Sequence, residues 1–269
     1  MLASNASAAS DADPVLTLFD GKAAGWPGKY AAGGRLAGRL TQLAEAVLDL
    51  AAARGELLDL GCGSGELARH LAAAGYQVTG CDIAPQMLRQ AVTADREHAV
   101  RWIRLEPRWR TLPFTADSLD AVVGSSVLEY VKDPAAVLAE CGRVLRPGGV
   151  LVCTVPNVAD PVRWLEWPLG LVARTPLAGI ARLGPHRLDQ YLAYLRTSRQ
   201  RRRVRWWHAA GREAGLEPVA VPPPVLGTTA RGAPPGRRSP RSREPLRLLA
   251  FTRSGGAAGH QIDSAGGRQ

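Results

Sequence analysis

The sequence lacks any long hydrophobic run. Nowhere in its 269 residues do about eighteen uncharged apolar residues follow one another, so no membrane-spanning helix is predicted. The opening MLASNASAAS has neither the basic nor the apolar stretch of a secretory signal. Cysteine is scarce and scattered, at Cys62, Cys81, Cys141 and Cys153, with no CxxC pair and no histidine cluster nearby. We therefore expect a cytoplasmic protein with neither a disulfide framework nor a metal site.

Lysine is nearly absent, since only three of the 34 basic residues are lysine and the others are arginine. The charge is also uneven along the chain. Residues 1–160 carry 15 basic and 18 acidic residues, a net charge of −3, whereas residues 161–269 carry 19 and 6, a net charge of +13. An arginine-rich half of this kind is typical of a solvated surface, and an acidic partner such as nucleic acid is the alternative.

Short apolar strands and amphipathic helices alternate along the chain. The pattern predicts strands at 57–60, 76–81, 100–105, 119–124, 150–155, 216–221 and 246–252. It predicts helices at 36–53, 66–74, 85–95, 134–145 and 204–214. Strands that alternate with helices at this spacing form a parallel sheet covered on both faces. The sequence therefore predicts a doubly wound α/β fold.

The predicted domain spans residues 36–253. We expect it to follow a partly disordered segment at 1–35 and to precede a disordered tail at 254–269. Two segments interrupt the alternation inside it. Residues 156–203 form a long irregular insertion, and 222–245 are rich in Pro, Arg and Gly and are expected to be mobile.

We expect the insertion to form the substrate-binding part of the chain. Its stretch at 162–180 is apolar with few charges, which predicts a lid over the site of the molecule that is modified (the acceptor). The alternative is an amphipathic helix that contacts a membrane surface. His186, beside Arg187, is a candidate general base because an imidazole can take up a proton near neutral pH.

The most informative segment is LLDLGCGSGE at 57–66, where a strand enters a turn and leaves as a helix. Gly61, Gly63 and Gly65 stand at alternate positions of this turn. Glycine is needed where the backbone adopts a positive φ or where a ligand approaches the backbone closely. The N–H groups that open the next helix can hold a carboxylate. The segment therefore predicts a cofactor-binding turn.

Two carboxylates flank this turn. Asp59 ends the first strand, where it can accept a hydrogen bond from a ligand's cationic amine. Asp82 ends the second strand, 17 residues beyond Gly65, where an acidic side chain of a doubly wound sheet can accept both ribose hydroxyls. A nicotinamide-dependent dehydrogenase would also bind its cofactor with a glycine turn and an acidic residue, but its turn has the spacing GxGxxG in place of the GxGxG found here.

Four separated runs in this order resemble the successive motifs of class I S-adenosylmethionine (SAM)-dependent methyltransferases. They are LLDLGCGSG, VTGCDIAPQML, LPFTADSLDAVVGSSVLEYV and AECGRVLRPGGVLVCTVPN, within residues 55–157. The chain is most similar to the small-molecule group that includes ubiquinone- and menaquinone-type enzymes. The resemblance implies a Rossmann-like, seven-stranded, mostly parallel sheet whose last strand, 246–252, is antiparallel. It also implies SAM as the cofactor.

The resemblance further implies a SAM site after the first, second and fourth strands. The residues concerned are Asp59, Gly61, Gly63, Gly65, Asp82, Ile83 and Ser125. The three glycines would line the methionine part of SAM, with Asp59 near its amine. Asp82 would hold the ribose hydroxyls, Ile83 would pack on the adenine, and the backbone of Ser125 would lie near the sulfonium.

The chain departs from the family pattern at two binding positions. Arg108 stands where the family usually has an acid that receives the adenine amine. Glu106 or a stacked Trp109 could serve the adenine in its place. Ser126 stands where metal-dependent quinone O-methyltransferases carry a further acid, which agrees with the absence of a metal site.

A third departure concerns catalysis, since Tyr130 stands where many relatives have histidine. Tyr130 and His186 are the candidate catalytic residues, and Glu129 is interpreted as an acid in the first turn of a helix. The chain lacks the Asn/Asp-Pro-Pro-aromatic motif of exocyclic-amine methylases. We therefore expect methylation of an oxygen or carbon of a small organic acceptor: a secondary metabolite, a quinone or a sugar. An RNA methyltransferase and a non-catalytic SAM-binding scaffold are the alternatives.

Overall fold

The computed structural model describes residues 13–30, 36–173, 175, 186–198, 200–221 and 246–255. Most of the segments expected to be disordered or mobile, including 222–245, lie outside these residues. Within the described ranges, helices and strands alternate as the sequence predicts. No helix in this part of the chain has the length and apolar character needed to cross a membrane.

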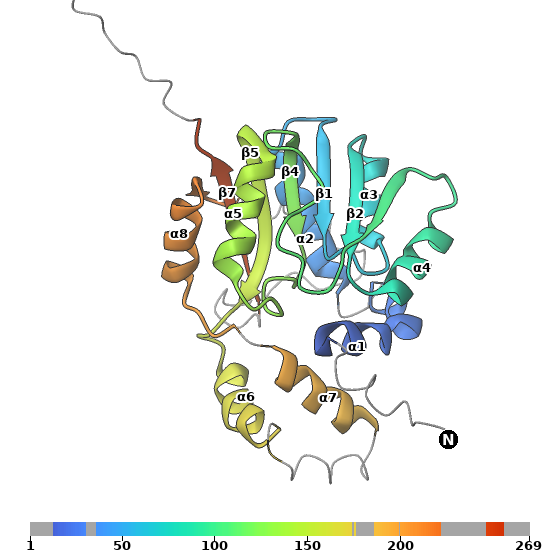
Figure 1. The fold of residues 1–269 in the computed structure, drawn as a ribbon, viewed down its shortest axis with the longest axis vertical. Coiled ribbons are helices and arrows are strands. Elements are labelled where there is room, and N and C mark those ends of the chain that lie inside the picture. The colour runs from blue at the N-terminus through green and yellow to red at the C-terminus, as the bar shows by residue number, and fades with distance from the viewer. Residues whose placement is uncertain are drawn as a thin grey trace, which may run out of the picture.

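Seven strands form one sheet in the order β3-β2-β1-β4-β5-β7-β6 (Figure 1). They are β1 (Glu56–Leu60), β2 (Gln77–Asp82), β3 (Val100–Arg104), β4 (Leu119–Gly124), β5 (Leu145–Pro156), β6 (Leu216–Val219) and β7 (Leu246–Arg253). Strands β1 to β5 pair in parallel, and β7 runs antiparallel to both of its neighbours. The predicted seven-stranded sheet with an antiparallel last strand is confirmed.

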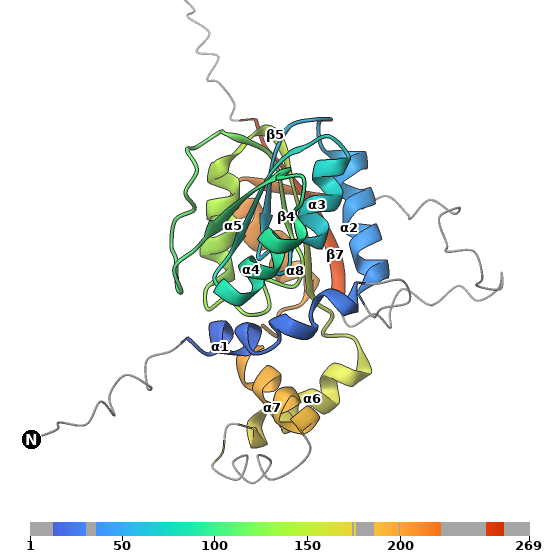
Figure 2. The same ribbon diagram turned by 90° about the vertical axis from the view of Figure 1, so that its right-hand side faces the viewer.

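Helices cover both faces of this sheet, which confirms the doubly wound prediction. Figure 2 shows α2 and α3 on one face and α5 on the other. The main helices of the domain are α2 (Ala37–Leu50), α3 (Glu66–Ala73), α4 (Pro85–Ala94), α5 (Pro134–Val144) and α8 (Val204–Glu213). Helices α2 and α3 bury apolar residues in one core cluster, and α5 and α8 bury theirs in the other.

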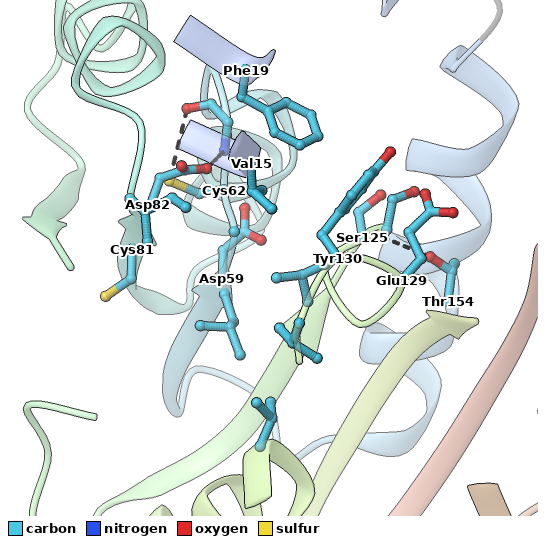
Figure 3. A pocket seen from close by; sticks show the side chains of 18 of the residues that line it. Val15, Phe19, Asp59, Cys62, Cys81, Asp82, Ser125, Glu129, Tyr130 and Thr154 are labelled. Atoms are coloured by element: carbon cyan, nitrogen blue, oxygen red, sulfur yellow. Dashed lines mark hydrogen bonds between the residues drawn. The ribbon is translucent and has the colours of Figure 1, made fainter. Parts of the chain in front are cut away.

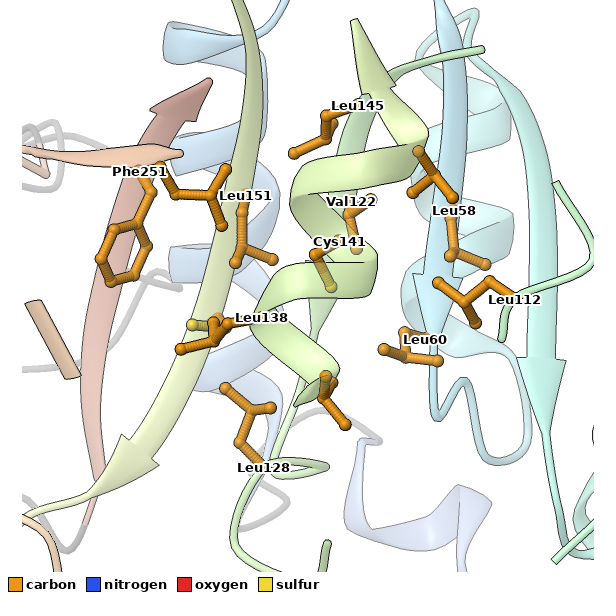
Figure 4. Close-up of a cluster of buried hydrophobic side chains, with 14 of the residues drawn as sticks. Leu58, Leu60, Leu112, Val122, Leu128, Leu138, Cys141, Leu145, Leu151 and Phe251 are labelled. Carbon is orange, nitrogen blue, oxygen red and sulfur yellow. The ribbon is translucent and has the colours of Figure 1, made fainter. Parts of the chain in front are cut away.

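The strands have apolar residues on both faces, because both faces are covered. Leu57 and Leu58 are neighbours in β1 and are 1% and 0% exposed, yet they belong to opposite clusters. Successive side chains of a strand point to opposite faces, so a buried parallel strand is a continuous apolar run. Figure 4 shows Leu138 and Cys141 of α5 in one cluster with Leu58 and Val122 of the sheet.

The insertion at 156–203 is helical where the sequence suggested irregular structure. It contains α6 (Pro161–Val172) and α7 (His186–Thr197), which pack on each other through Ala173, Leu192 and Leu195. Prolines obscured the helical pattern. Pro161 begins α6, where the missing N–H has no helical partner to lose, and Pro168 stands inside the helix.

The N-terminal segment is helical from its first described residues. Helix α1 (Pro14–Asp20) begins at Asp13, whose carboxylate accepts hydrogen bonds from the N–H groups of Val15 and Leu16. At its other end, Asp20 accepts one from the N–H of Gln86 in the first turn of α4, at 2.9 Å. Helix α1 also contacts α7. Helices α1, α6 and α7 thus lie together beyond one end of the sheet (Figure 1).

Candidate functional site

A cavity of about 1390 Å³ lies at the carboxyl ends of β1, β2 and β4. The strand order reverses between β1 and β4, and open α/β sheets bind their ligands at such a switch point. Most of the predicted site residues line this cavity: Asp59, Gly61, Gly63, Asp82, Ile83, Ser125 and Tyr130. The side chain of His186, the first residue of α7, lies outside the described part of the structure.

The glycine turn has the backbone that its sequence predicts. The φ angles of Gly61, Gly63 and Gly65 are +69°, +56° and +79°. Gly61 and Gly63 line the cavity, whereas Gly65 serves packing. A Cβ atom on Gly65 would lie 2.4 Å from the ring of Trp102 and 3.0 Å from Cβ of Ala91. Gly61 and Gly63 bring backbone to the cavity, where Cβ atoms would lie 2.9 Å from Val127 and 3.3 Å from Trp26, and Gly65 lets α3 start close to its neighbours.

Asp82 is held rigidly at the edge of the cavity. One carboxylate oxygen accepts a hydrogen bond from the N–H of Gly63 and the other from the N–H of Ala84, each at 2.8 Å. Burial raises the pKa of Asp82, while these backbone hydrogen bonds act in the opposite direction. Because each carboxylate oxygen can accept two hydrogen bonds, Asp82 retains capacity for a pair of hydroxyl groups in the cavity.

Asp59 is a buried carboxylate in need of a partner. Asp59 is 1% exposed, and neither oxygen has a hydrogen bond of standard geometry among the described residues, although the backbone of Ala68 lies near enough to oppose the rise in its pKa. Burial raises its pKa to about 8, and the neighbouring charge of Asp82 contributes to the same shift. Both carboxylates are directed into the cavity (Figure 3). A buried unpaired carboxylate costs free energy, and a cationic amine in the cavity would remove that cost.

The chain turns sharply after β4 and forms the opposite wall. Ser126 has a φ of +62°, and its N–H donates to Oγ1 of Thr154 at the end of β5, at 2.7 Å. Its hydroxyl accepts a hydrogen bond from Arg39 of α2, at 2.8 Å. These contacts fix the turn that presents Ser125 to the cavity, opposite Asp59 (Figure 3).

Glu129 lies in this turn, before α5 begins, and not in the first turn of a helix. It is 4% exposed and lines the cavity beside Ser125 and Thr154 (Figure 3). The sequence interpretation of Glu129 as an acid in the first turn of a helix is thus wrong. Its local sequence resembles a helix start, and local sequence does not indicate that a residue is buried at a cavity.

Aromatic side chains form another wall that sequence reasoning missed. Phe19, Trp26 and Tyr30 of the N-terminal segment all line the cavity. The ring of Phe19 meets that of Tyr130 edge to face, with centroids 5.0 Å apart. Tyr130 in turn lies 6.5 Å from Tyr194 of α7. Tyr130 thus connects the N-terminal segment to the insertion.

Tyr30 lies in the carboxylate-rich part of the cavity. Burial raises its pKa to about 12, with the charges of Glu66 and Asp59 acting in the same direction. A hydrogen bond with the side chain of Ser125 partly opposes this shift. Tyr30 is therefore a neutral hydroxyl at physiological pH, available as a hydrogen-bond donor.

Arg108 and its loop form the end of the cavity nearest β3. Trp109 lines the cavity, and Glu106 is exposed. The Nε atom of Arg108 lies 3.6 Å from Oδ2 of Asp13, so the basic side chain is paired with the N-terminal segment. The Asp13-Pro14 pair, an N-cap followed by a proline, is the local sign of a helix that sequence reasoning passed over.

Comparisons with known proteins agree with this geometry. Residues 58–153 match the family model described as a methyltransferase domain. A ubiquinone biosynthesis O-methyltransferase of Xanthomonas oryzae pv. oryzae is 33% identical over 146 residues, covering 54% of this chain and 59% of the relative. The chain therefore spans little more than half the length of the curated relatives it matches.

Solved structures share the fold at low sequence identity. An S-adenosylmethionine-dependent methyltransferase from Mesorhizobium loti has a TM-score of 0.54 and 20% identity, over 80% of this chain and 100% of that one. A TehB-like SAM-dependent methyltransferase from Corynebacterium glutamicum has a TM-score of 0.52 and 17% identity, over 88% and 99%.

Proposed function

We propose that this chain, which belongs to the class I SAM-dependent methyltransferase superfamily, methylates an oxygen or carbon of a small organic acceptor. Membership implies SAM as the cofactor. The curated relatives are named as O-methyltransferases of ubiquinone biosynthesis, which favours a hydroxyl acceptor. We propose the cytoplasm as its location, because its four cysteines are free thiols.

The hydrogen-bonding groups around the glycine turn fit this cofactor. The unpartnered carboxylate of Asp59 suits the amine of the methionine part. Asp82 keeps acceptor capacity for the two ribose hydroxyls. Gly61 and Gly63 have positive φ angles and line the cavity with backbone that carries no side chain of its own.

The size and shape of the cavity carry the proposal of a small acceptor. Its volume of about 1390 Å³ exceeds the roughly 300–1,000 Å³ of a typical pocket for one small molecule. The space beyond the cofactor residues is lined by Tyr130 and Glu129, and by Glu166, Tyr191 and Tyr194 of the insertion. A second molecule therefore has room beside the cofactor, between aromatic side chains and two acids.

When bound, SAM supplies an electrophilic methyl group on a sulfonium. The chain's own residues have to orient the acceptor, exclude water and, for a hydroxyl, take up its proton. The rings of Phe19, Tyr130 and Tyr194, which meet edge to face, would shield one side of the acceptor from water. Glu129 is the candidate base that the geometry adds to Tyr130 and His186, because its buried carboxylate lies at the cavity.

The test is acceptor-dependent formation of S-adenosylhomocysteine by the purified protein. SAM with a labelled methyl group is offered together with phenolic, hydroxyquinone and sugar acceptors. We expect turnover with one class, and loss of that turnover when 160–200 are replaced by a short linker, while SAM binding is retained. Turnover that survives the replacement would overturn the assigned acceptor site. SAM binding without turnover on any acceptor would favour the non-catalytic scaffold.

RNA is the second candidate acceptor, favoured by the charge of the C-terminal part. Residues 161–269 carry a net charge of +13. Arg202, Arg203 and Arg205 are exposed, and the guanidinium of Arg202 lies 4.2 Å from the centroid of the Trp206 ring. Binding to RNA that weakens steeply with salt, by about 10³–10⁵ between 50 and 200 mM for six to ten phosphate contacts, would support it. Absent or salt-insensitive binding would exclude it.

A further inference from the structure

The end of the cavity beside β3 is where a nucleoside base would lie. Asp82, which fits the ribose, ends β2, and β3 is the next strand outward in the sheet. A base attached to that ribose would lie on the β3 side of it, where Ile83 lines the cavity. There the loop after β3 supplies Trp109 as an apolar surface and Arg108 as a charge. An exocyclic amine is a hydrogen-bond donor and so is a guanidinium, so Arg108 cannot receive an adenine amine.

The N-terminal segment brings a carboxylate to the same end of the cavity. Asp13, at the start of α1, lines the cavity, and its side chain is 13% exposed. One oxygen, Oδ1, accepts from the N–H groups of Val15 and Leu16, at 2.9 and 3.5 Å. The other, Oδ2, faces Nε of Arg108 at 3.6 Å, an ion-pair distance. Oδ1 therefore caps the helix, and Oδ2 is the oxygen that could accept a hydrogen bond from a ligand.

We propose that Asp13 accepts the hydrogen bond from the exocyclic amine of adenine, and that Arg108 holds its carboxylate in position. The N-terminal segment thereby completes the base-binding end of the cavity. This inference rests on the proposed function, because it requires a cofactor with an adenine base. It also predicts base selectivity, since a 6-oxo base presents an acceptor that Asp13 repels and Arg108 attracts.

The test compares S-adenosylhomocysteine with its deaminated analogue, which carries hypoxanthine, by titration calorimetry on the full chain. We expect the wild type to prefer the amine by at least about tenfold, because an unpaired charged acceptor costs more than about 1.4 kcal/mol. Asp13→Ser keeps a helix-capping hydroxyl but removes Oδ2. In this variant the preference should fall by about tenfold or reverse, with the deaminated compound binding more tightly than it does to the wild type.

Thr17→Ala is the matched control, because it perturbs α1 without touching the carboxylate. The Thr17 hydroxyl donates to the backbone oxygen of Asp13 at 3.2 Å, and its side chain is exposed. Its base preference should equal that of the wild type. An unchanged preference in Asp13→Ser would overturn the inference and leave Asp13 as a helix cap. Failure of the wild type to bind either compound would instead overturn the proposed cofactor itself.

Discussion

The carboxylate of Asp82 accepts a hydrogen bond from the N–H of Gly63 at 2.8 Å, which ties the end of β2 to the glycine turn after β1. The same side chain faces the cavity. Asp82 therefore shapes the turn that would hold the methionine part of SAM and also presents acceptors for the ribose. A substitution of Asp82 should therefore weaken ligand binding in two ways, by altering the glycine turn and by removing the acceptors for the ribose.

Asp82→Ala should weaken SAM binding by at least about tenfold, since each hydrogen bond to a charged group contributes about 1.5–3 kcal/mol. Calorimetric titration of SAM measures this. Asp120→Ala is the control: Asp120 accepts from the N–H of Glu56 at 2.8 Å, at the opposite end of β1. It should lower the melting temperature and leave the affinity unchanged. Equal affinities for Asp82→Ala and the wild type would remove Asp82 from the cofactor site.

Asp59→Asn should stabilise the cofactor-free protein at neutral to alkaline pH. A carboxyl group with a raised pKa holds its proton more tightly in the folded than in the unfolded chain. Its contribution to the free energy of unfolding is therefore full at low pH and is lost as the pH rises from 3.8 toward about 8. An asparagine does not titrate, so the variant should gain up to about 1.4 kcal/mol per pH unit over that interval. Melting temperatures of both proteins between pH 5 and pH 8 measure the difference.

The same substitution should weaken SAM binding, because the amide cannot pair with a cationic amine. Binding to the wild type near pH 7 should also release a proton from Asp59, which calorimetry in buffers of different ionisation enthalpy detects. Weaker binding with a higher melting temperature would be the expected pair of results. A variant that binds SAM as well as the wild type would assign the amine to another residue.

The sheet was predictable because its determinants are local. Leu57 and Leu58 lie in a short apolar run between turn residues. Such a run predicts a buried strand, whichever position the strand takes in a parallel sheet. The positive φ angles of the glycine turn likewise follow from residue type. The number of strands and the antiparallel direction of the last one were inferred from resemblance, because spacing alone does not specify which strands are neighbours.

The rest of the site could not be predicted because it depends on contacts between distant residues. Nothing near Asp13 in the sequence indicates that it meets Arg108, 95 positions away. Phe19 reaches Tyr130 from α1, whose end is joined to α4 by the hydrogen bond that Asp20 accepts from Gln86. Such contacts involve few residues and no periodicity, so a single sequence carries no pattern for them.

Gly65→Ala should destabilise the fold by about 1–3 kcal/mol. A Cβ atom would lie 2.4 Å from the Trp102 ring, and a φ of +79° is unfavourable for alanine. Urea unfolding measures the loss. Gly38→Ala is the control, because a Cβ atom there meets nothing within 4 Å. It should be neutral or stabilise α2 by up to about 1 kcal/mol. Equal stability of the two variants would mean that Trp102 moves aside without cost.

Glu129→Gln should lower kcat by about 10²–10⁴ with a hydroxyl acceptor, the range that general-base catalysis contributes. The amide has nearly the shape of the carboxylate but cannot take up a proton. SAM affinity should change little, because the two carboxylates that would hold the cofactor, Asp59 and Asp82, lie at the ends of β1 and β2, across the cavity from Glu129 (Figure 3). Single-turnover rates at saturating SAM, measured across pH, give the effect on the chemical step.

Tyr130→Phe tests whether Tyr130 or its neighbour Glu129 acts as the general base. The variant keeps the ring that meets Phe19 and Tyr194, and loses only the hydroxyl. If Glu129 is the base, Tyr130→Phe should retain the acidic limb of the wild-type pH–rate profile, and Glu129→Gln should lose it. The reverse result would assign the proton to Tyr130. Loss of the limb in neither variant would leave His186 as the candidate base, because a residue acting on the acceptor's proton has to titrate in the rate.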